Sequence, residues 1–181
     1  MWPFFLTATY DSTKTLRSSP KAVVNLLHDS ERLFRLHPLV ISVEKNSECP
    51  LSYTLIDDLP VLGGHVTMKT TYTCTVQLLE DGVEYNIVAG LGTRSKNTFH
   101  VKKGSEDNVC ELIERTTTQV CPTYLPVIYL KLTRSVQGFF LLMWYITRTQ
   151  LNAHEKFRDN LQLALEGELY RQTSGNNLDS N

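Results

Sequence analysis

Residues 66–78, Val-Thr-Met-Lys-Thr-Thr-Tyr-Thr-Cys-Thr-Val-Gln-Leu, alternate between two kinds of side chain along their whole length. Successive side chains of a β-strand point to opposite faces of its sheet, so this period of two predicts a strand with one apolar face and one wet, threonine-rich face. The apolar face carries Val66, Met68, Thr70, Tyr72, Cys74, Val76 and Leu78. A turn at Glu80-Asp81-Gly82 and a second alternating run over Val83–Gly90 indicate an antiparallel hairpin.

Further runs with strand character lie on both sides of this hairpin. They cover Phe4–Leu16, Val40–Glu44, Leu51–Ile56, Asn97–Lys102 and Val109–Cys121. Turn residues near Gly92 separate the run over Asn97–Lys102 from the hairpin before it. The chain is therefore predicted to begin with one strand and to form most of an antiparallel sheet between residues 40 and 121.

Helices are predicted after the first strand and near the end of the chain. Ser19 is a good N-cap and Pro20 suits the first helical position, so one short helix is expected to run to about His28. Asp29 or Ser30 can cap a second short helix, through Arg35. A long amphipathic helix is predicted over Thr147–Tyr170. Its apolar stripe contains Ala153, Phe157, Leu161, Ala164 and Leu165.

The most hydrophobic stretch of the chain is Val136–Ile146, which Arg134 and Arg148 flank. A membrane span needs roughly 20 apolar residues, so this stretch is interpreted as a buried or lid-forming segment, and stable membrane insertion is not expected. The length of 181 residues predicts one domain, over residues 1–171, followed by a disordered tail over residues 172–181.

Composition limits the partners and the compartment. Lys and Arg total 18 against 19 for Asp and Glu, so no strong field favours nucleic acid or anionic lipid. The cysteines have no metal-ligand or redox spacing and are interpreted as reduced thiols. They are Cys49, Cys74, Cys110 and Cys121. Residues 1–6 lack the features of a leader peptide, so a cytoplasmic location is expected. The sequence leaves open whether the protein forms a homodimer.

The order of these elements resembles that of a known superfamily. Three segments carry the resemblance: Thr7-Ala8-Thr9-Tyr10-Asp11, Leu36-His37-Pro38-Leu39-Val40 and the helix from His154 to Leu161. They are similar to the helix-grip superfamily (SRPBCC), which includes START lipid-transfer domains and polyketide cyclases, and within it to a group of small fungal proteins. The resemblance implies an α+β fold, in which a curved antiparallel sheet wraps around a long C-terminal helix and encloses a cavity for a hydrophobic metabolite.

Several kinds of chemistry lack their motifs. No G-x-S-x-G occurs, and the five histidines lie on different predicted elements, which disfavours a hydrolase triad. Gly90-Leu91-Gly92 and Gly63-Gly64 are too short for a dinucleotide loop and are interpreted as turns. Asp57 and Asp58 are interpreted as a turn before Pro60, because no third metal ligand is near in sequence. No cofactor and no metal are expected.

The candidate site therefore consists of side chains on inward faces. A cavity of roughly 300–1,000 Å³ is predicted, with Tyr72, Tyr85, Phe157 and Leu161 in its lining. Tyr72 is the candidate catalytic residue, as a hydrogen-bond donor to a ligand carbonyl. The candidate ligand-binding residues are Tyr53, Met68, Thr70, Cys74, Tyr85, Ile87, His100, Phe157 and Leu161. One of Glu114 and Arg115 is also expected to point inward, where its charge needs a partner. For His154 a solvated position and a cavity role both stay open.

Two functions fit this pattern. The first is a cofactor-independent cyclase of secondary metabolism, which folds a hydrophobic polyketide or terpenoid intermediate for ring closure, including closure of the pericyclic, Diels–Alder type. The second is a non-catalytic protein that binds or transfers a hydrophobic small molecule or lipid. Both functions predict a hydrophobic ligand.

Overall fold

The computed structural model describes residues 6–61, 66–90, 92–106, 108–120, 148–149 and 151–167. The strands are β1 (Leu6–Leu16), β2 (Val40–Lys45), β3 (Ser52–Val61), β4 (Val66–Leu79), β5 (Gly82–Ala89), β6 (Thr93–Lys103) and β7 (Cys110–Val120). Helices α1 (Pro20–His28) and α2 (Ser30–Leu36) lie between β1 and β2. Residues 148–149 are also helical, and residues 151–167 form the C-terminal helix.

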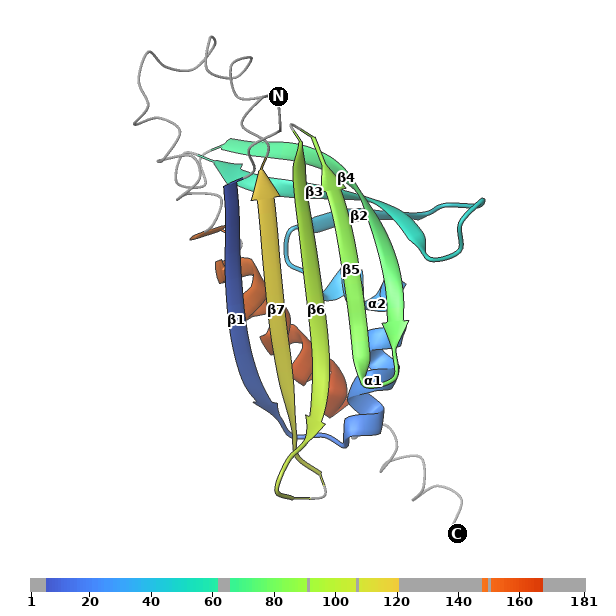
Figure 1. Cartoon of the computed structure of the whole chain (residues 1–181), viewed down its shortest axis with the longest axis vertical. Coiled ribbons are helices and arrows are strands. Elements are labelled where there is room, and N and C mark those ends of the chain that lie inside the picture. The colour runs from blue at the N-terminus through green and yellow to red at the C-terminus, as the bar shows by residue number, and fades with distance from the viewer. Residues whose placement is uncertain are drawn as a thin grey trace.

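These strands form one antiparallel sheet in the order β1-β7-β6-β5-β4-β3-β2. From β2 to β7 every strand pairs with the next one along the chain, whereas β1 pairs with β7 over its full length, from Leu6–Val120 to Leu16–Cys110. Helices α1 and α2 therefore carry the chain from one edge of the sheet to the other. The sheet is curved, and the C-terminal helix lies across one of its faces (Figure 1).

The alternation predicted for β4 is confirmed. Cys74 and Val76 are buried, whereas Thr71, Thr73 and Thr75 are exposed on the opposite face. Leu78 and Met68 differ from the prediction, because they are 44 % and 53 % exposed toward the two ends of the strand. The buried face of the sheet packs on the C-terminal helix, whose inner residues Phe157, Leu161 and Leu165 belong to the same core as β4.

The predicted helix starts are confirmed by their capping bonds. The Ser19 side chain accepts a hydrogen bond from the Ala22 backbone N–H at 3.3 Å, and Pro20 occupies the first turn of α1. Asp29 caps α2 through a 3.2 Å bond from the Arg32 backbone N–H. These caps satisfy backbone donors that the first turn of a helix leaves unpaired. They fix the elbow that positions the end of α2 over the sheet.

The structure corrects the interpretation of Asp57 and Asp58 as a turn. Strand β3 continues through both residues to Val61, and Asp57 pairs with Thr70 of β4. Pro60 fits because the pairing of β2 with β3 ends at Asp57, so Pro60 lies where β3 has a partner on the β4 side alone. The period of two that places Leu55 inside therefore also places Asp57 inside.

Some predictions lie outside the described residues. They concern the apolar stretch Val136–Ile146, residues 172–181 and Cys121. The predicted helix over 147–170 is described at 148–149 and 151–167 alone. Within the described part of the chain, no helix has the length and apolar character to cross a membrane.

Candidate ligand cavity

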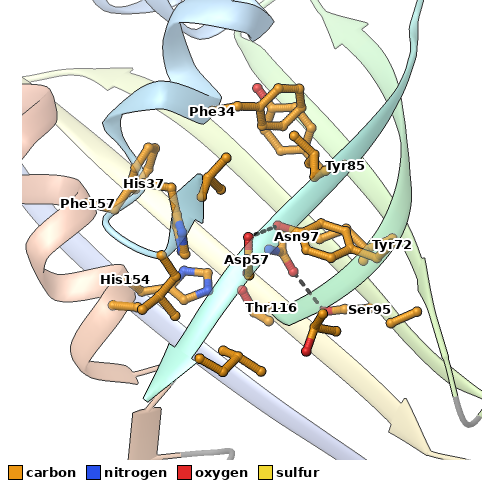
Figure 2. A pocket seen from close by; sticks show the side chains of 18 of the residues that line it. Phe34, His37, Asp57, Tyr72, Tyr85, Ser95, Asn97, Thr116, His154 and Phe157 are labelled. Carbon is orange, nitrogen blue, oxygen red and sulfur yellow. Dashed lines mark hydrogen bonds between the residues drawn. The ribbon is translucent and has the colours of Figure 1, made fainter. Parts of the chain in front are cut away.

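A cavity of about 340 Å³ lies between the sheet and the C-terminal helix. Its walls come from α2, the segment after α2, strands β2 to β7 and the C-terminal helix (Figure 2). Most of the wall is apolar and includes Leu33, Phe34, Leu55, Ile87, Phe99 and Phe157. This volume is at the lower end of the usual range of about 300–1,000 Å³ for ligand pockets, and an apolar lining with a few polar groups is typical of such pockets.

One polar group of the wall is the pair of Asp57 and Tyr72. The Tyr72 hydroxyl donates a hydrogen bond to Asp57 Oδ1 at 2.9 Å. Burial raises the pKa of the Asp57 carboxyl to about 6, although the bond from Tyr72 opposes this rise. Burial, together with the Asp57 charge, raises the pKa of Tyr72 above its ordinary value. Near neutral pH the pair therefore consists of a neutral phenol and a carboxyl that can take up or release a proton.

A second polar group surrounds Glu114 of β7, which is fully buried. His154 Nδ1 forms a short hydrogen bond with Glu114 Oε1, and Arg158 Nη1 donates to Glu114 Oε2 at 2.9 Å. Burial alone would raise the pKa of Glu114, but its interactions with His154 and with the Arg158 guanidinium lower it below its ordinary value. Glu114 is therefore held as a carboxylate. Of these three residues, His154 lines the cavity.

His37, just after α2, lies beside this group. Its ring centroid is 5.9 Å from that of His154 and 6.1 Å from that of Phe157. Its Nδ1 atom is buried and has no hydrogen-bond partner among the described residues. Burial and the neighbouring His154 lower the pKa of His37 to about 4, so its imidazole is neutral at physiological pH. A buried polar atom without a partner is rare, and here it lies in the wall of a cavity.

Strands β6 and β7 add neutral polar side chains. Ser95 Oγ donates to Asn97 Oδ1 at 3.0 Å and lies 3.1 Å from Thr118 Oγ1. Ser95, Asn97 and Thr116 all line the cavity (Figure 2). These side chains give the wall hydrogen-bonding groups without adding charge.

Six of the residues predicted for the site line this cavity. They are Met68, Thr70, Tyr72, Tyr85, Ile87 and Phe157. Tyr53, Cys74 and Leu161 do not line it, because they are buried in the core behind the wall. Tyr85 is held in place by its hydroxyl, which donates to the Leu27 carbonyl at 3.3 Å.

The structure corrects the prediction for His100. Its side chain is 43 % exposed and pairs with Asp81 at 3.0 Å, on the face of β6 opposite to the cavity. The neighbouring residues Phe99 and Val101 are buried. A strand cannot bury three successive side chains on one face, so the burial of these two sends His100 outward.

Most residues of the polar groups were not among the predicted ligand-binding residues, and Glu114, His154, Asp57 and His37 show why. The expectation that Glu114 or Arg115 points inward is settled for Glu114, since Arg115 bonds to exposed Asp11 at 2.7 Å. His154 takes the cavity position that the sequence left open. Asp57 shares the strand period of Tyr53 and Leu55, which could have identified it. For His37 the sequence offers no periodicity, because it follows the end of α2.

Metal ligands do not gather in the described part of the chain. No group of three or more His, Cys, Asp or Glu side chains is placed there to hold a metal ion. The polar groups of the cavity are instead paired with one another, or face the open volume.

Comparison with known proteins identifies a family and supports the fold. Residues 17–166 match the model of a family described as "Domain of unknown function (DUF7053)". No curated protein matches this sequence.

Solved structures similar to this chain include the Zhui aromatase/cyclase from Streptomyces sp. R1128, with TM-score 0.64, 11 % identity, and coverage of 91 % of this chain and 96 % of that one. A START superfamily protein from Mycobacterium smegmatis has TM-score 0.59 and 10 % identity, covering 88 % and 97 %. The di-domain ARO/CYC StfQ of the steffimycin biosynthetic pathway has TM-score 0.63 and 15 % identity, covering 91 % of this chain and 52 % of that one. At these identities the likeness shows a START-like, helix-grip fold.

Proposed function

Because the chain belongs to the family described as "Domain of unknown function (DUF7053)", we infer its function from the cavity. We propose that the protein is a cofactor-independent cyclase acting on a hydrophobic small molecule. The observation that carries the proposal is a titratable carboxyl in an apolar wall, since Asp57 has a pKa of about 6 and bonds to Tyr72. A general base works best when its pKa lies near the working pH. A protein that only stores an apolar ligand has no need of such a group.

The proposed ring closure moves one proton and forms one carbon–carbon bond. The Asp57 carboxylate takes a proton from a carbon beside a substrate carbonyl, and the electron pair left on that carbon attacks a second carbonyl of the same molecule. The π electrons of that carbonyl become an alkoxide, which recovers the proton from Asp57. The product is an isomer of the substrate, so atoms and electrons balance without a cofactor.

Tyr72 is proposed as the hydrogen-bond donor of this reaction. In the structure its hydroxyl is bound to Asp57. When Asp57 takes the substrate proton, its carboxyl loses its charge and holds the Tyr72 hydroxyl less strongly. The hydroxyl can then donate to the developing oxyanion, which is the interaction that stabilises such a transition state.

Closure of the Diels–Alder type is a second form of the same proposal. It transfers no proton, so the apolar walls would supply the reactive conformation and Tyr72 would polarise a carbonyl. Asp57→Asn separates the two forms, because it removes the base and keeps the shape. A polar closure should slow by a large factor in this variant, whereas a pericyclic closure should keep most of its rate.

The proposal places the protein in secondary metabolism, with a polyketide or terpenoid intermediate as substrate and the cytoplasm as its location. The resemblance to small fungal proteins of the helix-grip superfamily supports this setting. A non-catalytic carrier is the second candidate, because the mainly apolar wall would retain the same ligand without any reaction.

The deciding assay is incubation of candidate linear precursors with the wild-type protein, with Tyr72→Phe and without protein. Cyclised product and its isomer ratio are followed by chromatography. Loss of one donor to a developing oxyanion costs up to about 10²–10³ in rate, so Tyr72→Phe should bind the precursor and turn it over more slowly. Identical yield and isomer ratio in all three incubations would contradict catalysis for every precursor tested.

A further inference from the structure

His154 has the arrangement of a base whose orientation is fixed by a buried carboxylate. Its Nδ1 bonds to Glu114, which is fully buried, and Glu114 is also bound by Arg158 at 2.9 Å. Thr116 Oγ1 adds a weaker bond to Glu114 at 3.4 Å. The carboxylate and the guanidinium balance each other in charge. The imidazole therefore has a fixed direction within a network that is neutral without it.

This hydrogen bond decides which nitrogen of His154 is left to meet a ligand. In the neutral ring Nδ1 carries the proton, because Glu114 is an acceptor, and Nε2 carries the lone pair. Nε2 is the ring nitrogen that the bond to Glu114 does not use. His154 lines the cavity. A lone pair held in this way is suited to accept a proton from a bound molecule, and Glu114 would stabilise the imidazolium that forms.

His37 supplies the complementary group. Its ring meets that of His154 edge to face at 5.9 Å, and its buried Nδ1 has no partner among the described residues. Because His37 is neutral, it carries one N–H that can donate to a ligand oxygen. Two imidazoles, one an acceptor and the other a donor, thus border the same part of the cavity (Figure 2).

We propose that His154 and His37 form a binding site for an acidic hydroxyl group, a phenol or an enol, on a hydrophobic ligand. In the bound state the ligand O–H bond breaks, an N–H bond forms at His154 Nε2, and the electron pair stays on the ligand oxygen. The N–H of His37 donates to that oxygen. The imidazolium and the oxyanion balance each other, just as Arg158 balances Glu114, so the cavity stays neutral overall.

This inference deepens the proposed function and rests on it for the presence of a ligand. It also narrows the substrate class. An apolar wall favours entry of an uncharged molecule, and a phenol or an enolised 1,3-dicarbonyl enters uncharged and ionises only beside the base. Asp57, a carboxyl group of the same wall, has its own partner in Tyr72.

The test uses 4-nitrophenol, whose ionised form absorbs at longer wavelength, and 4-nitroanisole, which has the same ring without an acidic hydrogen. At a pH about one unit below the pKa of free 4-nitrophenol, the free probe is mostly protonated. Binding to the wild-type protein should shift its absorbance toward the ionised form. A hydrogen bond to a charged group should make 4-nitrophenol bind at least about tenfold more tightly than 4-nitroanisole. Equal affinities and an unshifted spectrum would overturn the inference.

Two variants locate the effect. His154→Phe keeps a ring of similar size and should abolish both the shift and the preference, while still binding 4-nitroanisole. Glu114→Gln should lower the ionised fraction of bound 4-nitrophenol by about tenfold relative to the wild type, because the imidazolium loses its counter-charge. Glu111→Gln, an exposed residue of the same strand, is the matched control. A shift that persists in a folded His154→Phe protein would assign the proton acceptor elsewhere and overturn the inference.

The wild-type measurement decides the question if both variants fail to fold. It also separates this inference from the proposed function. If the wild type binds 4-nitroanisole and cyclises a precursor but does not ionise 4-nitrophenol, this inference alone fails. If neither probe binds and no precursor reacts, both fail together.

Discussion

Replacing Asp57 by asparagine is expected to stabilise the protein above about pH 6. Asparagine has the size of aspartate and keeps an oxygen that can accept the bond from Tyr72, but it carries no charge to bury. The pKa of Asp57 rises from the ordinary 3.8 to about 6 in the folded protein, chiefly because the carboxyl is buried. Folding therefore favours the protonated form of this residue.

The magnitude and sign follow from proton linkage. Between pH 3.8 and about 6 the folded protein holds a proton on Asp57 that the unfolded chain has lost, so stability falls as pH rises through this window. Above about pH 6 both states are ionised and the loss is complete. At about 1.36 kcal/mol per pH unit, the interval from 3.8 to about 6 corresponds to about 3 kcal/mol as an upper value.

The assay is urea unfolding of both proteins at several pH values from about 4 to 8, analysed as a two-state transition. Groups such as Glu114 also change stability with pH, but they do so in both proteins. The difference in unfolding free energy thus isolates Asp57. At the acid end, Asp57→Asn should be as stable as the wild type or less stable. At the alkaline end, Asp57→Asn should be more stable than the wild type by up to about 3 kcal/mol.

Tyr72→Phe provides an internal check, because the Tyr72 hydroxyl lowers the pKa of Asp57. Its removal should move the falling part of the pH profile to higher pH. A difference between wild type and Asp57→Asn that stays constant with pH would refute a raised pKa at this position. It would also remove the argument for Asp57 as a base near neutral pH.

Two further variants test the packing and the buried charge. Phe157→Ala removes more atoms than Leu161→Ala but should cost no more unfolding free energy than that variant, which is expected to lose about 2–5 kcal/mol, because Phe157 borders a cavity that already exists and Leu161 is fully buried. Denaturant unfolding of both variants checks this. A clearly larger cost at Phe157 would count against the cavity. Glu114→Ala should cost about 3–5 kcal/mol by leaving Arg158 without its buried partner, with exposed Glu111→Ala as control, and a cost close to that control would contradict the buried pair.

The sequence predicts the framework of this protein well because the framework depends on local patterns. The period of two in β4 and the caps at Ser19 and Asp29 are decided by neighbours in sequence, and they are confirmed. The prediction for His100 was wrong because it assigned the side chain to the wrong face of strand β6. The large apolar side chains of Phe99 and Val101 decide which face is buried, and they outweigh an imidazole.

The polar groups of the cavity are harder to predict because they form between distant elements. Glu114 and His154 are 40 residues apart in sequence, and neither position shows in its own strand or helix which partner it will meet. Asp57 was assigned to a turn because Asp58 and Pro60 are common turn residues. Pairing with β4 keeps all three residues in strand β3 instead. A cavity wall is thus a property of packing, and local propensity does not encode it.

The most direct test of the central claim, that the cavity holds a hydrophobic ligand, is a binding measurement on a variant that fills it. Ala89 of β5 lines the cavity, whereas Val88, the residue before it in the same strand, is 56 % exposed. Titration with 4-nitroanisole should show binding to the wild type and to Val88→Phe, and a loss of at least about tenfold in Ala89→Phe, since a phenyl group would occupy the ligand volume. Equal affinity of all three folded proteins would contradict the account.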